Sequence, residues 1–170
     1  TRIENGTLPL RRDAEMIGDI FHEALSHVDR RAAEHEIRVE LEDDMLMANM
    51  DARLIVQVII NIVNNAVKYT PEGSDICLSA KKENSMVRIE IADNGPGISD
   101  EAKQRLFDMF YTVNTGSAGA DSRRGLGLGL SLCKSIVEAH SGSITVHDNQ
   151  PHGSVFSFTL PLEEVKIQNV

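Results

Sequence analysis

The sequence predicts an α/β two-layer sandwich in which paired strands lie on one side of three helices. Two apolar stretches with helical spacing, over 16–34 and 51–69, are longer than an ordinary strand. Pairs of short alternating segments, bounded by turn residues, follow at 75–92 and again at 143–160. Helices and strands that interleave along 170 residues, of which 41% are hydrophobic, form one layered domain with a sizeable core.

Each element follows from the local pattern. Residues 1–13 read as a connector, and the apolar positions that begin at Met16 predict an amphipathic helix to about residue 34. Alternation over Glu36–Leu41 predicts a strand, and the helix from about 51 to 69 is ended by Thr70-Pro71-Glu72-Gly73. The remaining expected elements are strands near 75–82 and 86–92, a short helix near 100–110, a loop from 111 to 126, a helix from about 127 to 140, and strands near 143–148 and 154–160.

Composition restricts the classes of partner. A formal net charge of -9 argues against nucleic-acid backbones and anionic membranes as primary partners. Two cysteines, Cys77 and Cys133, fit a reducing cytosol better than a disulfide framework. No run approaches the ~20 apolar residues of a membrane span, and no signal peptide is recognisable. Because the first residue is Thr1 rather than Met, we expect the chain to be a fragment of a longer protein.

A polar stripe runs along the helix predicted over 51–69. Its members, Gln57, Asn61, Asn65 and Lys68, are spaced by four, four and three residues, so they lie above one another opposite the apolar residues. A solvated helix face usually carries Glu and Lys, whereas Asn disfavours helices because its amide competes for backbone hydrogen bonds. The asparagines therefore lower helix stability, and this cost indicates a functional face.

Two glycine-containing segments could bind a ligand. The first, Asp93-Asn94-Gly95-Pro96-Gly97, follows a predicted strand and is either an ordinary turn or a carboxylate beside glycines that let a ligand approach the backbone. The second, Arg123-Arg124-Gly125-Leu126-Gly127-Leu128-Gly129, precedes a predicted helix, where N–H groups and the helix dipole favour anions. The alternative for this second segment is a flexible hinge. It matches neither the dinucleotide-binding fingerprint nor the P-loop, since the chain has no Gly-Lys pair.

The loop from Tyr111 to Ser122 consists mainly of small and polar residues. It is longer than an idle connection between two elements requires. The composition leaves two interpretations, a lid over a ligand or an unstructured segment.

In this order, the segments resemble the ATP-binding catalytic domain of sensor histidine kinases, in the GHKL family. The resemblance covers residues 50–160 and implies the Bergerat fold, a mixed sheet with three main helices on one face. Any one motif is weak, but five in the family's order are strong. They are Asn61–Tyr69 as the N box, Asp93–Gly97 as the first glycine box, Leu106–Phe110 as the F box, Gly125–Leu130 as the second glycine box and Gly153–Pro161 as the closing strand.

The resemblance implies a role for each matching residue. Asn65, with Asn61 beside it, would hold Mg²⁺ through an amide oxygen or water, since hard oxygen ligands suit that ion. Lys68 and Arg124 would meet the phosphates of ATP, and Asp93 would accept a hydrogen bond from the adenine amino group. The other nucleotide contacts would come from Tyr69 against the adenine, from Gly95, Gly97 and Ile98, and from Gly125, Leu126, Gly127, Leu128 and Gly129.

The implied reaction is transfer of the γ-phosphoryl group of ATP to a histidine, mainly by positioning and charge neutralisation. The family's acceptor sequence, His-Glu or His-Asp followed by Leu-Arg-Thr-Pro, is not present, because His22-Glu23 is followed by Ala-Leu. We therefore expect the acceptor histidine on a separate dimerisation domain, upstream of the connector, and a response regulator downstream. Residues 14–163 would be the catalytic domain and 164–170 a tail, in the cytoplasmic part of a membrane-anchored bacterial sensor.

The first residues carry a further, short resemblance. Thr1–Leu10 is similar to the segment after the dimerisation helices in KdpD-type potassium-sensor kinases.

Two other function classes remain open from the sequence. One is a GHKL ATPase of the gyrase, mismatch-repair or chaperone type, and the other is a nucleotide-binding regulatory module without catalysis. Position 61 argues against the first, because those ATPases resemble one another in having Glu there as the general base. Asn61 cannot take up a proton at neutral pH.

Overall fold

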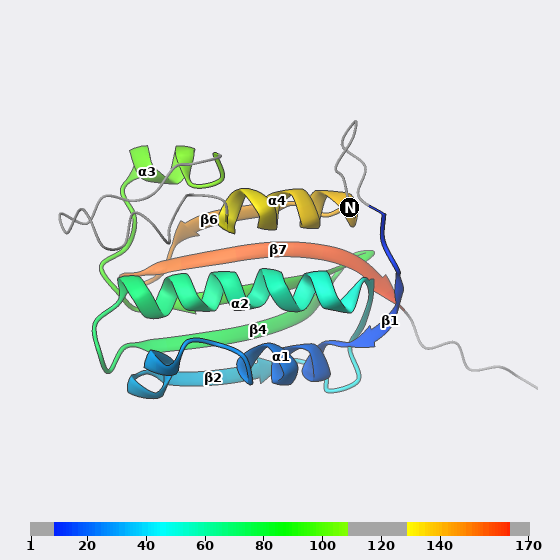
Figure 1. Cartoon of the computed structure of the whole chain (residues 1–170), viewed down its shortest axis with the longest axis horizontal. Helices are drawn as coiled ribbons and strands as arrows, with labels where there is room; N and C mark the ends of the chain where they lie inside the picture. Colours follow the sequence, from blue (N-terminus) through cyan, green and yellow to red (C-terminus); the bar gives the residue numbers. More distant parts are fainter. Residues whose placement is uncertain (1–8, 109–128, 164–170) are drawn as a thin grey trace, which may run out of the picture.

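The computed structural model describes residues 9–108 and 129–163. These residues form two layers, a seven-stranded sheet and three helices on one of its faces (Figure 1). The helices are α1 (Ile17–Leu25), α2 (Ala52–Tyr69) and α4 (Gly129–Ala139), and the shorter α3 (Asp100–Arg105) lies at one end of the molecule. The predicted α/β two-layer sandwich is confirmed.

The sheet is mixed. Its strands follow the order β1-β3-β7-β5-β4-β2, and β6 pairs with the part of β7 that β3 leaves open. The pair of β2 with β4 is parallel, and the other pairs are antiparallel. The strands are β1 (Asp13–Met16), β2 (Glu36–Leu41), β3 (Met47–Met50), β4 (Asp75–Glu83), β5 (Met86–Asp93), β6 (Ile144–Asp148) and β7 (Ser154–Glu163).

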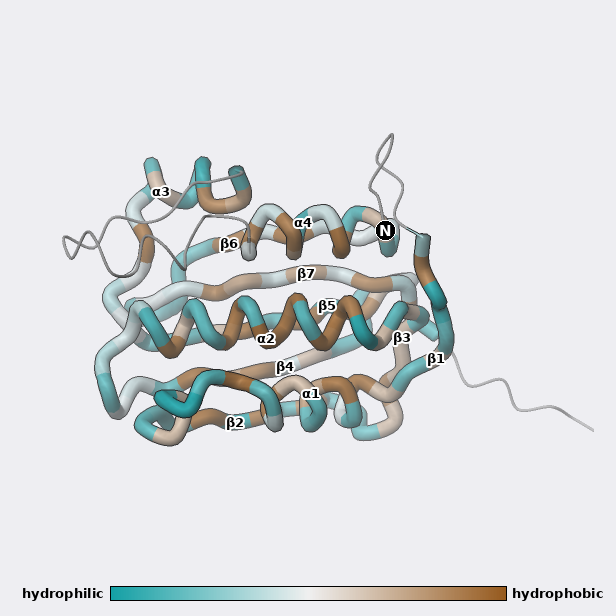
Figure 2. Tube along the Cα trace, viewed as in Figure 1, coloured by the Kyte–Doolittle hydropathy of each residue, from teal (hydrophilic) through white to brown (hydrophobic). Residues whose placement is uncertain are grey.

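The core lies between the sheet and α2. The apolar residues of α2 recur with helical spacing and are buried, and the hydrophobic positions gather on this helix and the strands behind it (Figure 2). On β5 the buried residues Val87, Ile89 and Ile91 alternate with partly exposed ones, as expected for a strand with one face in the core. α2 ends before Pro71, because proline disfavours helical backbone at the preceding Thr70, which is extended.

The single helix predicted from 16 to 34 is wrong. Residues 13–16 form β1, α1 ends at Leu25, and a separate 3-10 helix, η1 (Arg30–Glu34), follows. Asp29 keeps the two helical segments separate, because its backbone is not helical and its side chain caps η1 by accepting the N–H of Arg31. The apolar residues keep their helical spacing across this turn, so the spacing alone could not show that the helix is interrupted.

Two other boundaries also differ. The sequence pattern did not predict β3, a four-residue strand, and α3 ends at Arg105 rather than near 110. The loop predicted from 111 to 126, with the candidate lid Tyr111–Ser122, and the beginning of the helix predicted from 127 lie outside the described residues. Within the described ranges, no helix is both long enough and apolar enough to cross a membrane.

The first turn of α2 is joined to distant segments through Asp51, which is only 1% exposed. Its carboxylate accepts the backbone N–H of Arg11 at 3.0 Å and the guanidinium of Arg53 at 3.1 Å. Its own backbone N–H donates to Nε2 of His140 at 2.9 Å, while Nδ1 of that ring lies 2.7 Å from the carbonyl of Ile136. His140 is fully buried just beyond α4, and it accepts at Nε2 only as the neutral ring.

This contact predicts a pH dependence of stability. Burial, assisted by the charge of Arg12, lowers the pKa of His140 in the folded chain. Below about pH 6.5 the unfolded chain takes up a proton that the folded chain excludes, so the free energy of unfolding falls as the pH falls. We expect His140→Gln, which keeps an acceptor and a donor, to make unfolding between pH 7 and pH 5 less pH-dependent in urea titrations. Parallel profiles for the two proteins would contradict this assignment.

Candidate functional site

The site is built around Asp93, the last residue of β5. The residue is 8% exposed, and its Oδ1 accepts the backbone N–H groups of Gly95 at 2.9 Å and Ser154 at 3.2 Å. Oδ2 accepts no hydrogen bond from the described part of the chain. Burial raises the pKa of Asp93, and the two N–H groups oppose that rise. The arrangement presents one carboxylate oxygen to a ligand that can donate a hydrogen bond.

The glycines after Asp93 allow the loop to pack closely. A Cβ on Gly95 would lie 2.5 Å from Cγ2 of Thr70, at the end of α2, so a side chain there would force the two elements apart. Gly97 has a φ of 86°, a backbone conformation that residues other than glycine rarely adopt. The loop is therefore seated against the end of α2.

A hollow of about 470 Å³ lies outside this loop. Neither Asp93 nor the polar stripe of α2 lines it, and Gly95 is the one proposed nucleotide contact in its lining. Its lining residues are Pro71, Glu72, Gly73, Ser74, Asn94, Gly95, Pro96 and His152.

The polar stripe of α2 faces the beginning of α4. Nδ2 of Asn61 lies 3.5 Å from the carbonyl of Gly129 and 3.8 Å from Sγ of Cys133, and its Oδ1 accepts from Gln57 at 2.9 Å. Burial raises the pKa of Cys133 to about 12, so its thiol stays protonated. The structure thus brings the N-box helix together with the last glycine of the second glycine-containing segment, 68 positions later in the chain.

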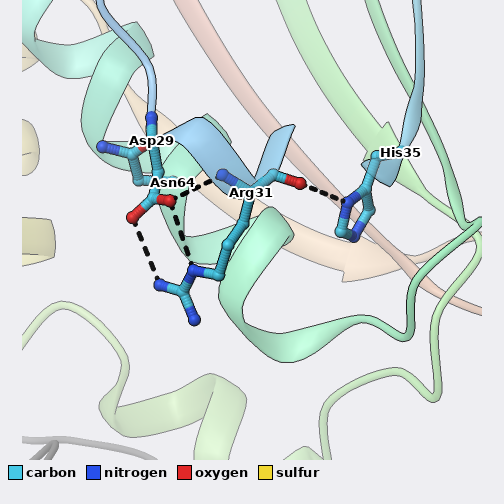
Figure 3. A network of polar contacts seen from close by, with 4 residues as sticks. All are labelled: Asp29, Arg31, His35 and Asn64. Carbon is cyan, nitrogen blue, oxygen red and sulfur yellow. Dashed lines mark hydrogen bonds and ion pairs between the residues drawn. The ribbon is translucent and has the colours of Figure 1, made fainter. Parts of the chain in front are cut away.

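Asn64 has a different role from its neighbours. Its Oδ1 accepts the backbone N–H of Asp29 at 2.7 Å and so fixes the segment that begins η1 (Figure 3). Asp29 in turn binds the side chain of Arg31, and the carbonyl of Arg31 lies 3.2 Å from Nδ1 of His35. Asn64 lies outside the polar stripe, and its side chain joins α2 to η1.

Asn65 and Lys68 are the partly exposed members of the stripe nearest the end of α2. The carboxamide of Asn65 makes no hydrogen bond with the described residues, so its oxygen is available to a ligand. Nζ of Lys68 lies 5.2 Å from the ring centre of Tyr69, within the range of a cation–π contact. The remaining predicted contacts, Arg124, Gly125, Leu126, Gly127 and Leu128, lie outside the described residues.

The segment after the loop is also anchored. Ile98 packs against the core, and Phe107 of the F box meets Phe156 edge to face with ring centres 6.3 Å apart. Nζ of Lys103 on α3 lies 2.8 Å from carboxylate oxygens of both Asp100 and Asp148. These contacts hold the segment 98–107, which follows the loop after Asp93, against the rest of the domain.

The loop between β6 and β7, to which the sequence pattern assigns no role, contacts Asp93 directly. Asn149 donates from Nδ2 to the backbone carbonyl of Asp93 at 2.8 Å, and Ser154 supplies the N–H described above. Gly153 packs so closely that a Cβ would lie 1.9 Å from the same carbonyl. The only signal in the sequence was the Gly153–Ser154 pair at the beginning of the closing strand.

Comparison with known proteins agrees with this geometry. Residues 50–164 match the family described as histidine kinase-, DNA gyrase B-, and HSP90-like ATPase. The chain belongs to this family. Within it, the chain is a catalytic, ATP-binding domain of the sensor histidine kinase type. The sensor protein KdpD of Clostridium acetobutylicum is 40% identical to this histidine-kinase domain over 163 residues, which are 96% of the chain and 18% of KdpD.

Solved structures of histidine kinases are similar to this domain. The nucleotide-free catalytic domain of histidine kinase ThkA superposes with a TM-score of 0.77 at 28% identity, covering 89% of this chain and 96% of ThkA's domain. A structure of ThkA in complex with response regulator protein TrrA gives a TM-score of 0.72 at 26% identity, over 88% of this chain and 41% of that one. The mixed sheet with helices on one face is thus the fold of histidine kinase catalytic domains.

Proposed function

We propose that residues 14–163 transfer the γ-phosphoryl group of ATP to a histidine on a separate dimerisation domain. Residues 1–13 would connect the two domains, and 164–170 would form a tail. The observation that carries the proposal is Asp93, whose Oδ1 is saturated by backbone N–H groups while Oδ2 is left for a donor. The 6-amino group of adenine is such a donor.

The other residues fit the remainder of ATP. Tyr69 would lie along the adenine, with Gly95, Gly97 and Ile98 at its edge. Lys68 would meet the phosphates together with Arg124 and the glycine-containing segment that ends at Gly129. The contact between Asn61 and Gly129 supports this arrangement, because it holds the end of that segment beside the polar stripe of α2.

The asparagines of the stripe suit Mg²⁺. The carboxamide of Asn65 makes no other hydrogen bond in the described structure, and amide oxygens are suitable ligands for this hard cation. Oδ1 of Asn61 already accepts from Gln57 and keeps one lone pair, so we assign Asn65 as the main ligand and Asn61 as its support. The bound ion would neutralise charge on the phosphates.

A hydrolase is the weaker alternative, because α2 contains no Asp or Glu from Ala52 to Tyr69. A water beside the γ-phosphate would have no base on this helix, and the side chain of Asn61 is held between Gln57 and Gly129. The proton from the attacking histidine would then leave to a group on the acceptor domain.

The chain spans 18% of the length of KdpD, so the activity and partners of a whole protein are part of this proposal. ThkA, a structural relative, is solved with a response regulator. We propose that a response regulator receives the phosphoryl group here too, and that the domain works in the cytoplasm as part of a membrane-anchored sensor.

A labelling experiment tests this function. Incubated with Mg²⁺ and γ-labelled ATP, the chain alone should not become labelled on histidine, whereas a supplied dimerisation domain from its own parent protein should. Acid-labile, base-stable label on that domain supports the proposal. Label on His22, or turnover of ATP by the chain alone at ~1 s⁻¹ or faster, would contradict it, since that rate is ordinary for an enzyme that hydrolyses its substrate.

A further inference from the structure

We propose that Asn149 is a positioning residue for Asp93, so that the selection of the base depends on the loop between β6 and β7. This inference rests on the proposed function, because it concerns the residue that would read the adenine. It adds a residue outside the motifs that carry the family resemblance.

The carbonyl of Asp93 lies just past the pairing of β5 with β7. The last pair in that ladder is Ala92 with Val155, and the N–H of the next β7 residue, Ser154, donates to Oδ1 of Asp93. Nδ2 of Asn149 donates to the carbonyl oxygen of Asp93 at 2.8 Å and takes the place of a ladder hydrogen bond. A buried carbonyl without a partner is destabilising, and this side chain supplies the partner.

Asn149 is itself held by two hydrogen bonds, one to its side chain and one from its backbone. Its Oδ1 accepts the N–H of Gln150 at 2.9 Å, and its backbone N–H donates to the carbonyl of Gly153 at 3.0 Å. These bonds fix the direction of Nδ2 toward Asp93. The loop is therefore preorganised and does not have to adapt when a nucleotide binds.

This loop and the first residue of β7 together hold Asp93 at its backbone carbonyl and at its side chain. Asn149 fixes the backbone carbonyl, and the N–H of Ser154 fixes Oδ1 of the carboxylate. Nδ1 of His152 lies 3.1 Å from the carbonyl of Gly95, two residues further along. With the carbonyl and Oδ1 both fixed, only one direction remains for Oδ2, and a tilt of the backbone would turn it away from the base.

The test compares ATP with inosine triphosphate, which carries an acceptor oxygen in place of the 6-amino group. Asn149→Asp keeps the acceptor for Gln150 and removes the donor to Asp93. We expect the preference for ATP, measured as the ratio of the two dissociation constants, to fall roughly fivefold, as for the loss of one hydrogen bond. The matched control is Gln150→Glu, which adds the same charge in the same loop, and it should leave the ratio unchanged.

Two further variants separate positioning from general damage. In an Asp93→Asn background, Asn149→Asp should not lower the ratio further, because the carboxylate it orients is gone. Asn149→Ala removes the donor without adding charge, and it replaces Asn149→Asp if that variant fails to fold. An unchanged ratio in a folded Asn149 variant, or an equal fall in the Asp93→Asn background, overturns the inference. If the unaltered chain does not prefer ATP, the proposed reading of adenine by Asp93 fails, and this inference fails with it.

Discussion

Asn65→Ala should lower phosphoryl transfer to the acceptor domain by about 100-fold or more, and ATP binding by roughly tenfold or less. The proposed metal ion neutralises charge that develops during transfer, and an interaction stronger in the transition state than in the bound substrate affects the rate most. Single-turnover transfer measured at saturating ATP, together with calorimetry of ATP binding, separates the two effects.

The matched control for Asn65→Ala is the same substitution at its neighbour. Asn64 accepts the N–H of Asp29 and is not among the proposed nucleotide contacts. Asn64→Ala should therefore lower the free energy of unfolding by about 1 kcal/mol, a typical value for a lost hydrogen bond, and leave transfer by the folded protein nearly unchanged. Equal losses of transfer in both variants would contradict the assignment of Asn65 as the metal ligand.

Gly153→Ala should lower the free energy of unfolding by about 3 kcal/mol or more. The new Cβ would lie 1.9 Å from the carbonyl of Asp93, and the residue has a φ of 112°, so both overlap and backbone strain contribute. Since the overlap is with the residue proposed to bind adenine, any folded variant should also bind ATP more weakly. Urea unfolding and calorimetry provide the two measurements.

Gly73→Ala is the matched control, because Gly73 has a φ of 87° but no atom within 4 Å of the position that a Cβ would occupy. Gly73→Ala introduces the backbone strain without the overlap, so it should lower the free energy of unfolding by only about 1 kcal/mol. Similar losses at the two glycines would show that the approach of Gly153 to Asp93 is not tight.

The long elements of the fold could be predicted because their own residues specify them. α2 and the hairpin of β4 with β5 have a clear period and clear turn residues, and their predicted bounds agree with the structure within one residue. The division of 16–34 into two helical elements could not be predicted, since Asp29, which caps η1, is held by Asn64, 35 residues away. β3 is short, and it becomes a strand through pairing with β1 and β7.

In the candidate site, too, local sequence specifies some residues and distant contacts specify others. Spacing alone placed Asn61 and Asn65 on one helix face and separated them from the apolar residues. The contact of Asn149 with Asp93 joins residues 56 positions apart, and nothing in the local sequence of either one specifies the other. A side chain that completes a site from a distant loop is found only once the sheet has brought the two strands together.

The position of β7 in the sheet has a consequence for folding during synthesis. This strand pairs with β5 on one edge and with β6 and β3 on the other, so within the described residues it alone joins the β1–β3 pair to the rest of the sheet. It is also the last strand of the described chain to leave the ribosome. Until residues 154–163 emerge, the pair β1–β3, the group β5-β4-β2 and the strand β6 are unconnected and have exposed edges, and such edges favour aggregation. Closure of the sheet, and with it completion of the Asp93 site, must therefore await the emergence of this strand.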